Sequence, residues 1–317
     1  MKFKVIRLTL RYNKAVVFAY HTVGVKCLKA LIEGGFEIPL VITHADNPDE
    51  NIWFESVASL CQSNQIPILL DPDLSDPQLQ ERIAQTQPDY LFSFYFRQMI
   101  PTQILQLAKM AALNMHGSLL PKYRGRVPIN WAVLHGEQET GATVHIMEIK
   151  PDAGDIVSQE VVQIGPDQTA FEVFSEVSQA AVIALEKVLP QLLQGQIPRS
   201  KNDLSMGSYF GGRKPQDGLI DWQASCHDVY NLYRAVAPPY PGAFTMLGEH
   251  QLIVAKARKM LPNSLPSNQA LGLGIFEGKI VGCCPDQGGL WIEELRQKES
   301  LVSVQDLQKL LNTLTNA

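Results

Sequence analysis

The sequence predicts an α/β fold, in which a Rossmann-like, mostly parallel sheet carries helices on both faces and is followed by a smaller C-terminal β-barrel of the OB-like kind. In the first two thirds of the 317 residues, short apolar runs alternate with helical patterns, which is typical of βαβ units. Beyond about residue 206, short β-like runs are separated by turns rich in Gly, Pro and Asn, which indicates a small barrel.

Five strands are predicted in the first region, followed by a pair of strands near one edge of the sheet. The run 90–96 is apolar and aromatic throughout, as expected of a central strand that is buried on both faces. The five strands span 15–20, 38–43, 66–70, 90–96 and 111–115, and the pair spans 142–149 and 156–164. In the C-terminal region, strands are expected at 242–247, 251–255 and 290–292.

Helices are predicted where apolar residues recur every three or four positions. The first helix follows strand 15–20 and ends at the Gly34-Gly35 pair. A long helix begins after Thr169, which forms a capping box with Glu172, and Pro190 should kink or end it. Further helices are expected at 51–62, 78–84 and 304–314.

A polar stretch between residues 195 and 208 marks the expected domain boundary. We therefore expect a first domain at 14–200, a C-terminal OB-like barrel domain at 206–317, and an N-terminal extension at 1–13. The extension has cationic residues spread through its apolar ones, so it lacks the uninterrupted apolar run of a secretory signal. A disordered tail is the favoured interpretation of this segment.

Charge and cysteine content restrict the class of protein. The formal net charge of −5 argues against a protein that mainly binds a polyanion, because neutralising phosphates requires clustered Lys and Arg. The five cysteines are an odd number without a CxxC pair, which indicates reduced thiols in a cytoplasm. Apolar runs of 18 residues are absent, so a membrane-spanning helix is not expected, and a homo-oligomer is allowed.

The stretch after residue 111 carries the strongest chemical signal. Asn114 and His116 are two positions apart near the end of a predicted strand, so their side chains project from one face at the edge where open α/β sheets bind ligands. An amide that donates to a developing oxyanion and an imidazole that transfers a proton suit acyl transfer. Taken alone, the pair also fits an Asn in a turn and a His that is satisfied by the backbone.

This stretch resembles the folate-dependent formyltransferases. Asn-x-His is followed by Gly-Ser-Leu-Leu-Pro at 117–121, by Tyr-Arg-Gly at 123–125, and by Asp-x-Gly-Asp at 152–155. The likeness runs from about Lys14 to about Lys259. It is closest to the subgroup that formylates UDP-4-amino-4-deoxy-L-arabinose for lipid A, on the evidence of runs such as Thr-His-Ala-Asp-Asn-Pro at 43–48.

The resemblance implies roles for individual residues. Asn114 would donate to the oxyanion, His116 would transfer the proton, and Asp152 would hold His116 and raise its pKa. The implied co-substrate is 10-formyltetrahydrofolate. Its implied contacts are Gln98, Met99, Ile100, Arg126, Glu148, Ile149, Lys150, Pro151 and Asp152. Relatives usually carry a different residue where this chain has Gln98, a change that backbone contacts would survive.

The implied acceptor is the amino group of a nucleotide-linked 4-amino sugar. UDP-4-amino-4-deoxy-L-arabinose is favoured, and TDP- or GDP-linked 4-amino-4,6-dideoxy sugars stay open. Lys122, Tyr123 and Arg124 are the candidate substrate contacts, since Arg forks match phosphate oxygens. No metal is predicted, because His21 and His44 lie at strand ends without a third ligand.

Three other functions are weighed against this one. A methionyl-tRNA formyltransferase would need a basic surface, whereas the chain has no Lys or Arg between Lys29 and Arg82. A non-catalytic folate-binding module would be expected to lose one of the three catalytic residues, and all three are present. A hydrolase that transfers formyl to water would not need the C-terminal domain. Finally, His145 is expected to be a structural histidine within a strand.

Overall fold

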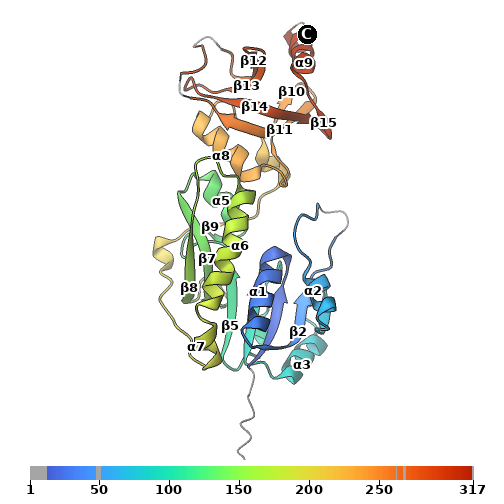
Figure 1. The fold of residues 1–317 in the computed structure, drawn as a ribbon, viewed down its shortest axis with the longest axis vertical. Coiled ribbons are helices and arrows are strands. Elements are labelled where there is room, and N and C mark those ends of the chain that lie inside the picture. The colour runs from blue at the N-terminus through green and yellow to red at the C-terminus, as the bar shows by residue number, and fades with distance from the viewer. Residues whose placement is uncertain (1–12, 48–50, 262, 267–268, 316–317) are drawn as a thin grey trace, which may run out of the picture. The chain divides into compact units, whose positions relative to one another are not determined.

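The structure is a computed structural model that describes residues 13–47, 51–261, 263–266 and 269–315. The expected N-terminal extension, 1–13, lies outside the described residues except for Asn13. The chain divides into two compact units (Figure 1). The first comprises Met1–Arg124, Gly141–Glu160 and Ser178–Ser208, and the second comprises Gly125–Thr140, Val161–Val177 and Tyr209–Ala317. The domain limits 14–200 and 206–317 remain a proposal.

A seven-stranded sheet forms the centre of the first unit. Its strands, in spatial order, are β3 (Ile68–Leu70), β2 (Glu37–Thr43), β1 (Lys14–Ala19), β4 (Tyr90–Phe94), β5 (Ala111–His116), β7 (Glu139–Ile146) and β8 (Ile156–Gln163). The first five are parallel, and β7 runs antiparallel to β5. The mostly parallel sheet with the pair β7 and β8 at one edge is therefore as the sequence predicts. The chain order reverses between β1 and β4, where such sheets bind ligands.

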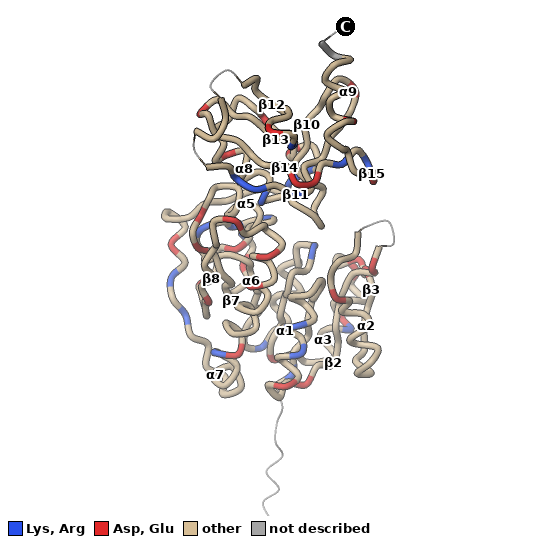
Figure 2. Tube along the Cα trace, turned by 45° about the horizontal axis from the view of Figure 1, so that its top comes forward, with Lys and Arg blue, Asp and Glu red and all other residues tan. Residues whose placement is uncertain are grey.

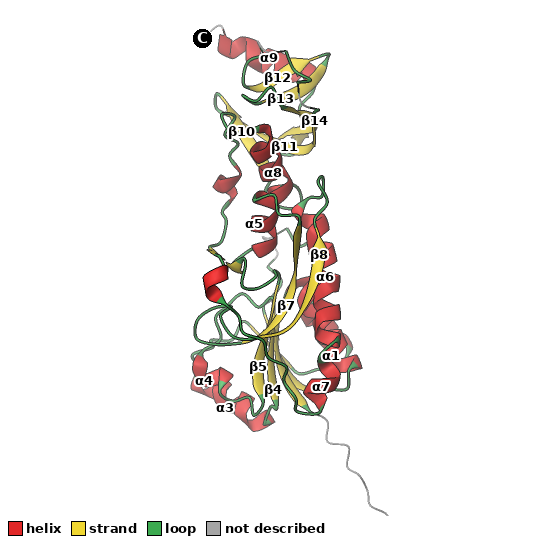
Figure 3. Cartoon of the chain, turned by 90° about the vertical axis from the view of Figure 1, so that its left-hand side faces the viewer, coloured by secondary structure: helices red, strands yellow, loops and turns green. Residues whose placement is uncertain are grey.

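Helices cover both faces of this sheet. They are α1 (His21–Glu33), α2 (Val57–Ser63), α3 (Pro77–Thr86), α4 (Thr102–Leu105), α6 (Ala170–Glu186) and α7 (Leu189–Leu193). Figure 3 shows α3 and α4 on one side of β4 and β5, and α1 and α7 on the other. Apolar side chains of the strands, α3 and α4 form one core, which includes Val16, Phe18, Leu40, Ile42, Ile83, Leu91 and Ile104.

Several elements begin or end away from their predicted limits, for local reasons. The helix predicted at 51–62 begins only at Val57, because the Ser56 side chain accepts a hydrogen bond from the Ser59 N–H and caps it there. Strand 90–96 ends at Phe94, since Tyr95 adopts a left-handed φ of 56°. The strand predicted at 142–149 spans 139–146 instead. The predicted capping box of Thr169 and Glu172 is present.

The second unit contains an antiparallel sheet that forms a half-barrel. In spatial order its strands are β10 (Ala243–Leu247), β11 (His250–Lys259), β14 (Gly289–Gln297), β13 (Lys279–Cys283) and β12 (Gly272–Phe276), with β15 (Ser300–Leu301) paired to β14. The helices are α5 (Pro128–Leu134), α8 (Cys226–Val236) and α9 (Val304–Thr315). Short elements complete the chain: strands β6 (Arg124–Gly125) and β9 (Tyr209–Phe210), and 3-10 helices η1 (Leu204–Met206) and η2 (Pro215–Gly218).

Charged residues of both signs lie along the described chain, whereas the cysteines lie in its interior. In Figure 2, Lys and Arg positions are interspersed with Asp and Glu positions along both units. All five cysteines are buried, and none forms a disulfide. Among the described residues, the helices are too short or too polar to cross a membrane.

Candidate functional site

The predicted residues Asn114 and His116 lie at the carboxyl end of β5. Asn114 pairs in register with Ser93 of the parallel strand β4, and His116 is the last residue of β5. The two side chains therefore lie at the edge of the sheet where the parallel strands end. This placement follows from the strand itself, since β5 spans Ala111–His116 where the sequence predicts a strand at 111–115.

The imidazole of His116 is fixed by the chain that follows it. Its Nε2 is 2.8 Å from the carbonyl oxygen of Tyr123. Because a carbonyl can only accept, Nε2 carries a proton and donates, which leaves the lone pair of the neutral ring on Nδ1. Nδ1 lies 3.6 Å from Oδ1 of Asp152. Asp152 thus faces the one ring nitrogen that can accept a proton.

Burial decides the protonation state of His116. The residue is 6% exposed, and burial lowers the pKa of its imidazole more strongly than the carboxylate of Asp152 raises it. The carboxylate of Asp152 does act to raise this pKa, as the resemblance implies, but the net shift is downward because burial outweighs it. A neutral imidazole with a free Nδ1 is suited to accept a proton from an incoming amine.

Asp152 is held in an uncommon backbone conformation by a tight turn. Its φ is 50°, in the left-handed region, which Asp tolerates better than most residues. Asn202 is buried, and its Nδ2 donates to the carbonyl oxygens of both Asp152 (3.0 Å) and Gly154 (3.1 Å). A Cβ on Gly154 would lie 2.2 Å from the carbonyl oxygen of Ile146, so only glycine fits there. The Asp-x-Gly-Asp motif therefore has a structural basis.

Sequence reasoning missed the role of His145, which was expected to be structural only. Its Nε2 lies 3.0 Å from Nδ2 of Asn114 and 3.3 Å from Oδ1 of Asp152, and the residue is 2% exposed. His145 therefore lies between the predicted amide and carboxylate. The only signal available in the sequence is its position on the strand that precedes Asp152. Asn202 was also missed, because it lies in the polar stretch interpreted as a domain boundary.

The hydrogen bonds of His145 also orient the amide of Asn114. Nδ1 of His145 lies 2.8 Å from the carbonyl oxygen of Ile146, to which it must donate. In the neutral ring, Nε2 then accepts from the amide nitrogen of Asn114. The second N–H of the Asn114 amide takes no part in this hydrogen bond. A protonated ring would instead donate from Nε2 to Asp152.

Two of the residues predicted to contact folate have exposed apolar side chains. Met99 is 63% exposed and Ile149 is 79% exposed, whereas Ile100 is buried in the core. Exposed apolar side chains of this size on a ligand-binding edge can cover an aromatic ring. Gln98, Glu148 and Lys150 are also exposed, and Pro151 is half-buried. Arg126 is exposed and belongs to the second unit.

The predicted substrate contacts differ in their exposure. Lys122 is exposed, whereas Tyr123 and Arg124 are 7% and 8% exposed. Tyr123 provides the backbone carbonyl that orients His116, which is a function its side chain does not reveal. Direct contacts between these residues and a substrate remain a proposal.

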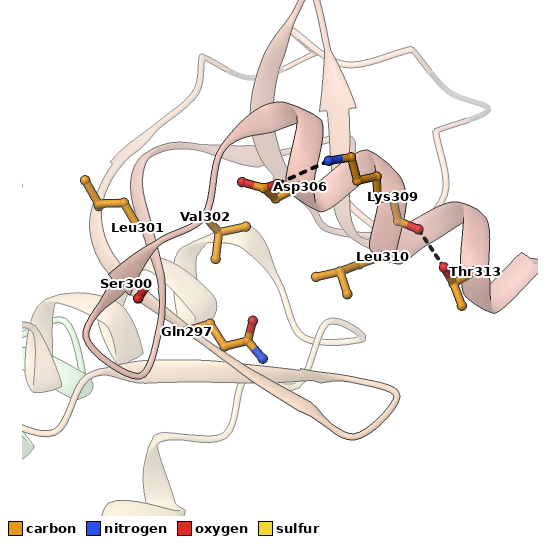
Figure 4. Close-up of a pocket in the computed structure, with 8 residues that line it drawn as sticks. All are labelled: Gln297, Ser300, Leu301, Val302, Asp306, Lys309, Leu310 and Thr313. Atoms are coloured by element: carbon orange, nitrogen blue, oxygen red, sulfur yellow. Dashed lines mark hydrogen bonds and ion pairs between the residues drawn. The ribbon is translucent and has the colours of Figure 1, made fainter.

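The cavity in Figure 4 contains none of the residues of this site, and the described residues provide no candidate metal centre. The described residues contain no group of three His, Cys, Asp or Glu side chains placed to hold a metal. A cavity of about 330 Å³ lies between β14, β15 and α9, with Asp306 and Lys309 forming a 3.8 Å ion pair at its wall. None of the predicted site residues lines it, and we assign it no function.

Comparison with known proteins identifies the family. The formyl transferase model matches residues 13–189, and the model of the formyl transferase C-terminal domain matches residues 213–309. The chain belongs to the formyl transferase family. It is accordingly a formyltransferase, an enzyme that transfers a one-carbon group.

Solved structures of formyltransferases share this fold. An N-formyltransferase from Helicobacter canadensis, in complex with folinic acid and dTDP-3-aminofucose, superposes with a TM-score of 0.70 at 18% identity, covering 89% of this chain and 99% of that one. A 4-N formyltransferase from Francisella tularensis gives 0.61 at 22% identity, over 75% and 93%. HypX from Aquifex aeolicus, bound to tetrahydrofolic acid, gives 0.63 at 17% identity, over 95% of this chain and 48% of that one.

Proposed function

We propose that this formyltransferase transfers a formyl group from 10-formyltetrahydrofolate to the amino group of a nucleotide-linked sugar. The observation that carries the proposal is the network in which His145 contacts both Asn114 and Asp152, and Asp152 faces Nδ1 of His116. The exposed apolar side chains of Met99 and Ile149 are available to pack against an aromatic ring, which supports an aromatic donor. The structural relatives named above support the acceptor class, because one is bound to a dTDP-linked amino sugar.

The three catalytic residues have separable roles in this proposal. When bound, the folate supplies an electrophilic formyl carbon. Asn114 donates its second amide N–H to the formyl oxygen as negative charge develops there. As the amine nitrogen bonds to the formyl carbon, His116 accepts the proton of the amine at Nδ1, and Asp152 stabilises the resulting imidazolium across 3.6 Å. His116 then returns this proton to N10 of the folate as the bond between N10 and the formyl carbon breaks, which releases tetrahydrofolate and restores the neutral ring.

The acceptor is proposed to be a 4-amino sugar, with UDP-4-amino-4-deoxy-L-arabinose favoured. Lys122 and Arg124 are the proposed contacts of its diphosphate. Transfer to methionyl-tRNA is the second candidate. The scarcity of Lys and Arg between Lys29 and Arg82 weighs against that candidate.

Single substitutions test the proposal. We expect Asn114→Ala, His116→Ala and Asp152→Ala each to lower kcat for formylation of a nucleotide-linked 4-amino sugar by roughly 10²- to 10⁴-fold. Product would be measured by mass spectrometry, and folding by circular dichroism. His250→Ala, at an exposed position of β11, is the matched control. Near-normal turnover of folded His116→Ala protein would exclude the proposed mechanism.

A further inference from the structure

The segment from Arg97 to Ile100 is tethered at both ends and exposed in the middle. Ile100 is buried in the core of the first unit, whereas Gln98 and Met99 between the tethers are exposed. At the other end, the backbone N–H of Arg97 donates to Nε2 of His44, over 3.2 Å. A segment restrained in this way presents its exposed residues in one fixed conformation, as a binding surface requires.

His44 is itself fixed in the tautomer that this contact needs. Because Nε2 accepts from Arg97, the proton of the neutral ring is on Nδ1, which donates to Oδ1 of Asp71 over 2.8 Å. The other carboxylate oxygen of Asp71 accepts the N–H of Ala45 over 2.8 Å. Asp71 therefore ties the ring of His44 to the loop that begins after β2.

Packing also holds the ring in place. His44 is 8% exposed and stacks on Phe96, with the ring centroids 4.4 Å apart and the planes inclined by 17°. Tyr20 contacts the same ring edge-on at 5.2 Å. Since Phe96 directly precedes Arg97, ring packing and the hydrogen bond to the backbone act on the same short piece of chain.

We propose that His44 and Asp71 are positioning residues, which hold the segment 97–100 in the conformation that binds the folate co-substrate. This inference rests on the proposed function, because it takes Gln98, Met99 and Ile100 as folate contacts. His44 contacts neither reacting atoms nor the network around His116 in this role. Its loss should weaken folate binding and leave the chemical step intact.

Two substitutions of similar size distinguish the loss of the hydrogen bond to the Arg97 N–H from the replacement of His44 by another polar side chain. The amide oxygen of Gln in His44→Gln reaches the position of Nε2 and can still accept from Arg97, whereas Asn in His44→Asn reaches only as far as Nδ1. We expect the KM for 10-formyltetrahydrofolate and the Kd for tetrahydrofolate to rise about 5- to 30-fold in His44→Asn, as for the loss of one buried hydrogen bond. His44→Gln should stay within about threefold of the wild type, and kcat should change little in either variant.

Hydrogen exchange of the Arg97 amide tests the same contact without turnover. The amide should be protected in the wild type and in His44→Gln, and should exchange faster in His44→Asn. The pair His250→Gln and His250→Asn, at an exposed position, controls for the substitutions themselves. Equal folate affinity in all three forms, or equal loss in both variants, would overturn the positioning role. Failure of the proposed function is distinct, since wild-type protein would then bind no tetrahydrofolate.

Discussion

Three buried histidines differ in the contacts that they make, because their partners occupy different ring nitrogens. The Nε2–H of His116 donates to a backbone carbonyl, which leaves Nδ1 facing Asp152. The Nδ1–H of His145 donates to a backbone carbonyl, so Nε2 can accept from Asn114. The Nδ1–H of His44 donates to Asp71, so Nε2 can accept from a backbone N–H. The chemistry of each residue therefore follows from which nitrogen its neighbour occupies.

The contact between His145 and Asn114 leads to a prediction about kcat. In His145→Ala the amide of Asn114 loses the partner that orients it, so its N–H no longer points reliably at the formyl oxygen. We expect kcat to fall about 10- to 100-fold with little change in either KM. His145→Gln, whose side-chain oxygen can replace Nε2 as acceptor, should recover much of this loss. Steady-state kinetics of the two variants would decide, and equal activity of His145→Ala and wild type would refute the orienting role.

His21 leads to a prediction about stability and pH. Burial, assisted by the charge of Arg97, lowers the pKa of His21 to about 3 from its ordinary value of 6.5. Above about pH 6.5 the ring is neutral in both states, so it adds no pH dependence. Below that value the unfolded state binds a proton that the folded state does not, and the free energy of unfolding falls by about 1.4 kcal/mol per pH unit until about pH 3.

Denaturant unfolding of wild type and His21→Asn between about pH 7.5 and 4.5 would measure this contribution. Asn tolerates the left-handed backbone of position 21, where φ is 68°. The variant should be less stable at neutral pH because it loses the ring stacked on Phe54 at 4.1 Å. Its stability should nevertheless fall less steeply with decreasing pH. Parallel curves for the two proteins would contradict the lowered pKa.

At the scale of elements, the turn after β7 determines where the carboxylate lies. Gly154→Ala would place a methyl group 2.2 Å from the Ile146 carbonyl, so the turn that carries Asp152 must move. We expect a loss of about 2 kcal/mol or more in the free energy of unfolding, together with lower kcat. Gly211→Ala is the matched control, since nothing lies within 4 Å of the added methyl group. It should change stability by less than about 0.5 kcal/mol.

The elements that the sequence predicts well are those whose signal is local. The strands near 15–20 and 38–43 are apolar runs bounded by turn residues, and the Thr169 capping box lies within one helical turn. Asn114 and His116 could be paired in advance because strand geometry places alternate residues on one face. For β5, the strand predicted at 111–115 from the local sequence pattern matches the observed strand Ala111–His116.

Features that depend on distant partners could not be predicted. Nothing near His145 indicates that Asn114, 31 residues earlier, will contact its ring, or that Asn202 will hold a turn 50 residues before it. The apolar pattern of β7 continues beyond Ile146, but the strand ends there because the chain bends at 149–150 and enters the turn that carries Asp152, whose φ is 50°. The balance of burial and charge on His116 likewise depends on the folded environment.

At the scale of the whole molecule, the charge distribution is the basis for expecting a sugar nucleotide and not a tRNA as the acceptor. Acidic and basic residues are interspersed, and the formal net charge is −5. A protein that binds tRNA neutralises many phosphates, and its affinity falls by roughly 10³- to 10⁵-fold between about 50 and 200 mM salt. A sugar nucleotide carries only two phosphates, so a few local cations suffice.

These alternatives predict different salt dependences and different products. In a mixture with 10-formyltetrahydrofolate, a panel of amino-sugar nucleotides and charged initiator tRNA, we expect one sugar nucleotide to gain a formyl group and the methionyl-tRNA to stay unmodified. The kcat/KM for that sugar should fall by no more than about 10-fold between about 50 and 200 mM salt, because two phosphate contacts release few counterions. Formylation of methionyl-tRNA with a steep loss of kcat/KM in salt would reverse the assignment of the acceptor. The network of Asn114, His116 and Asp152 would still account for the chemistry, since both acceptors present an amine to the same formyl carbon.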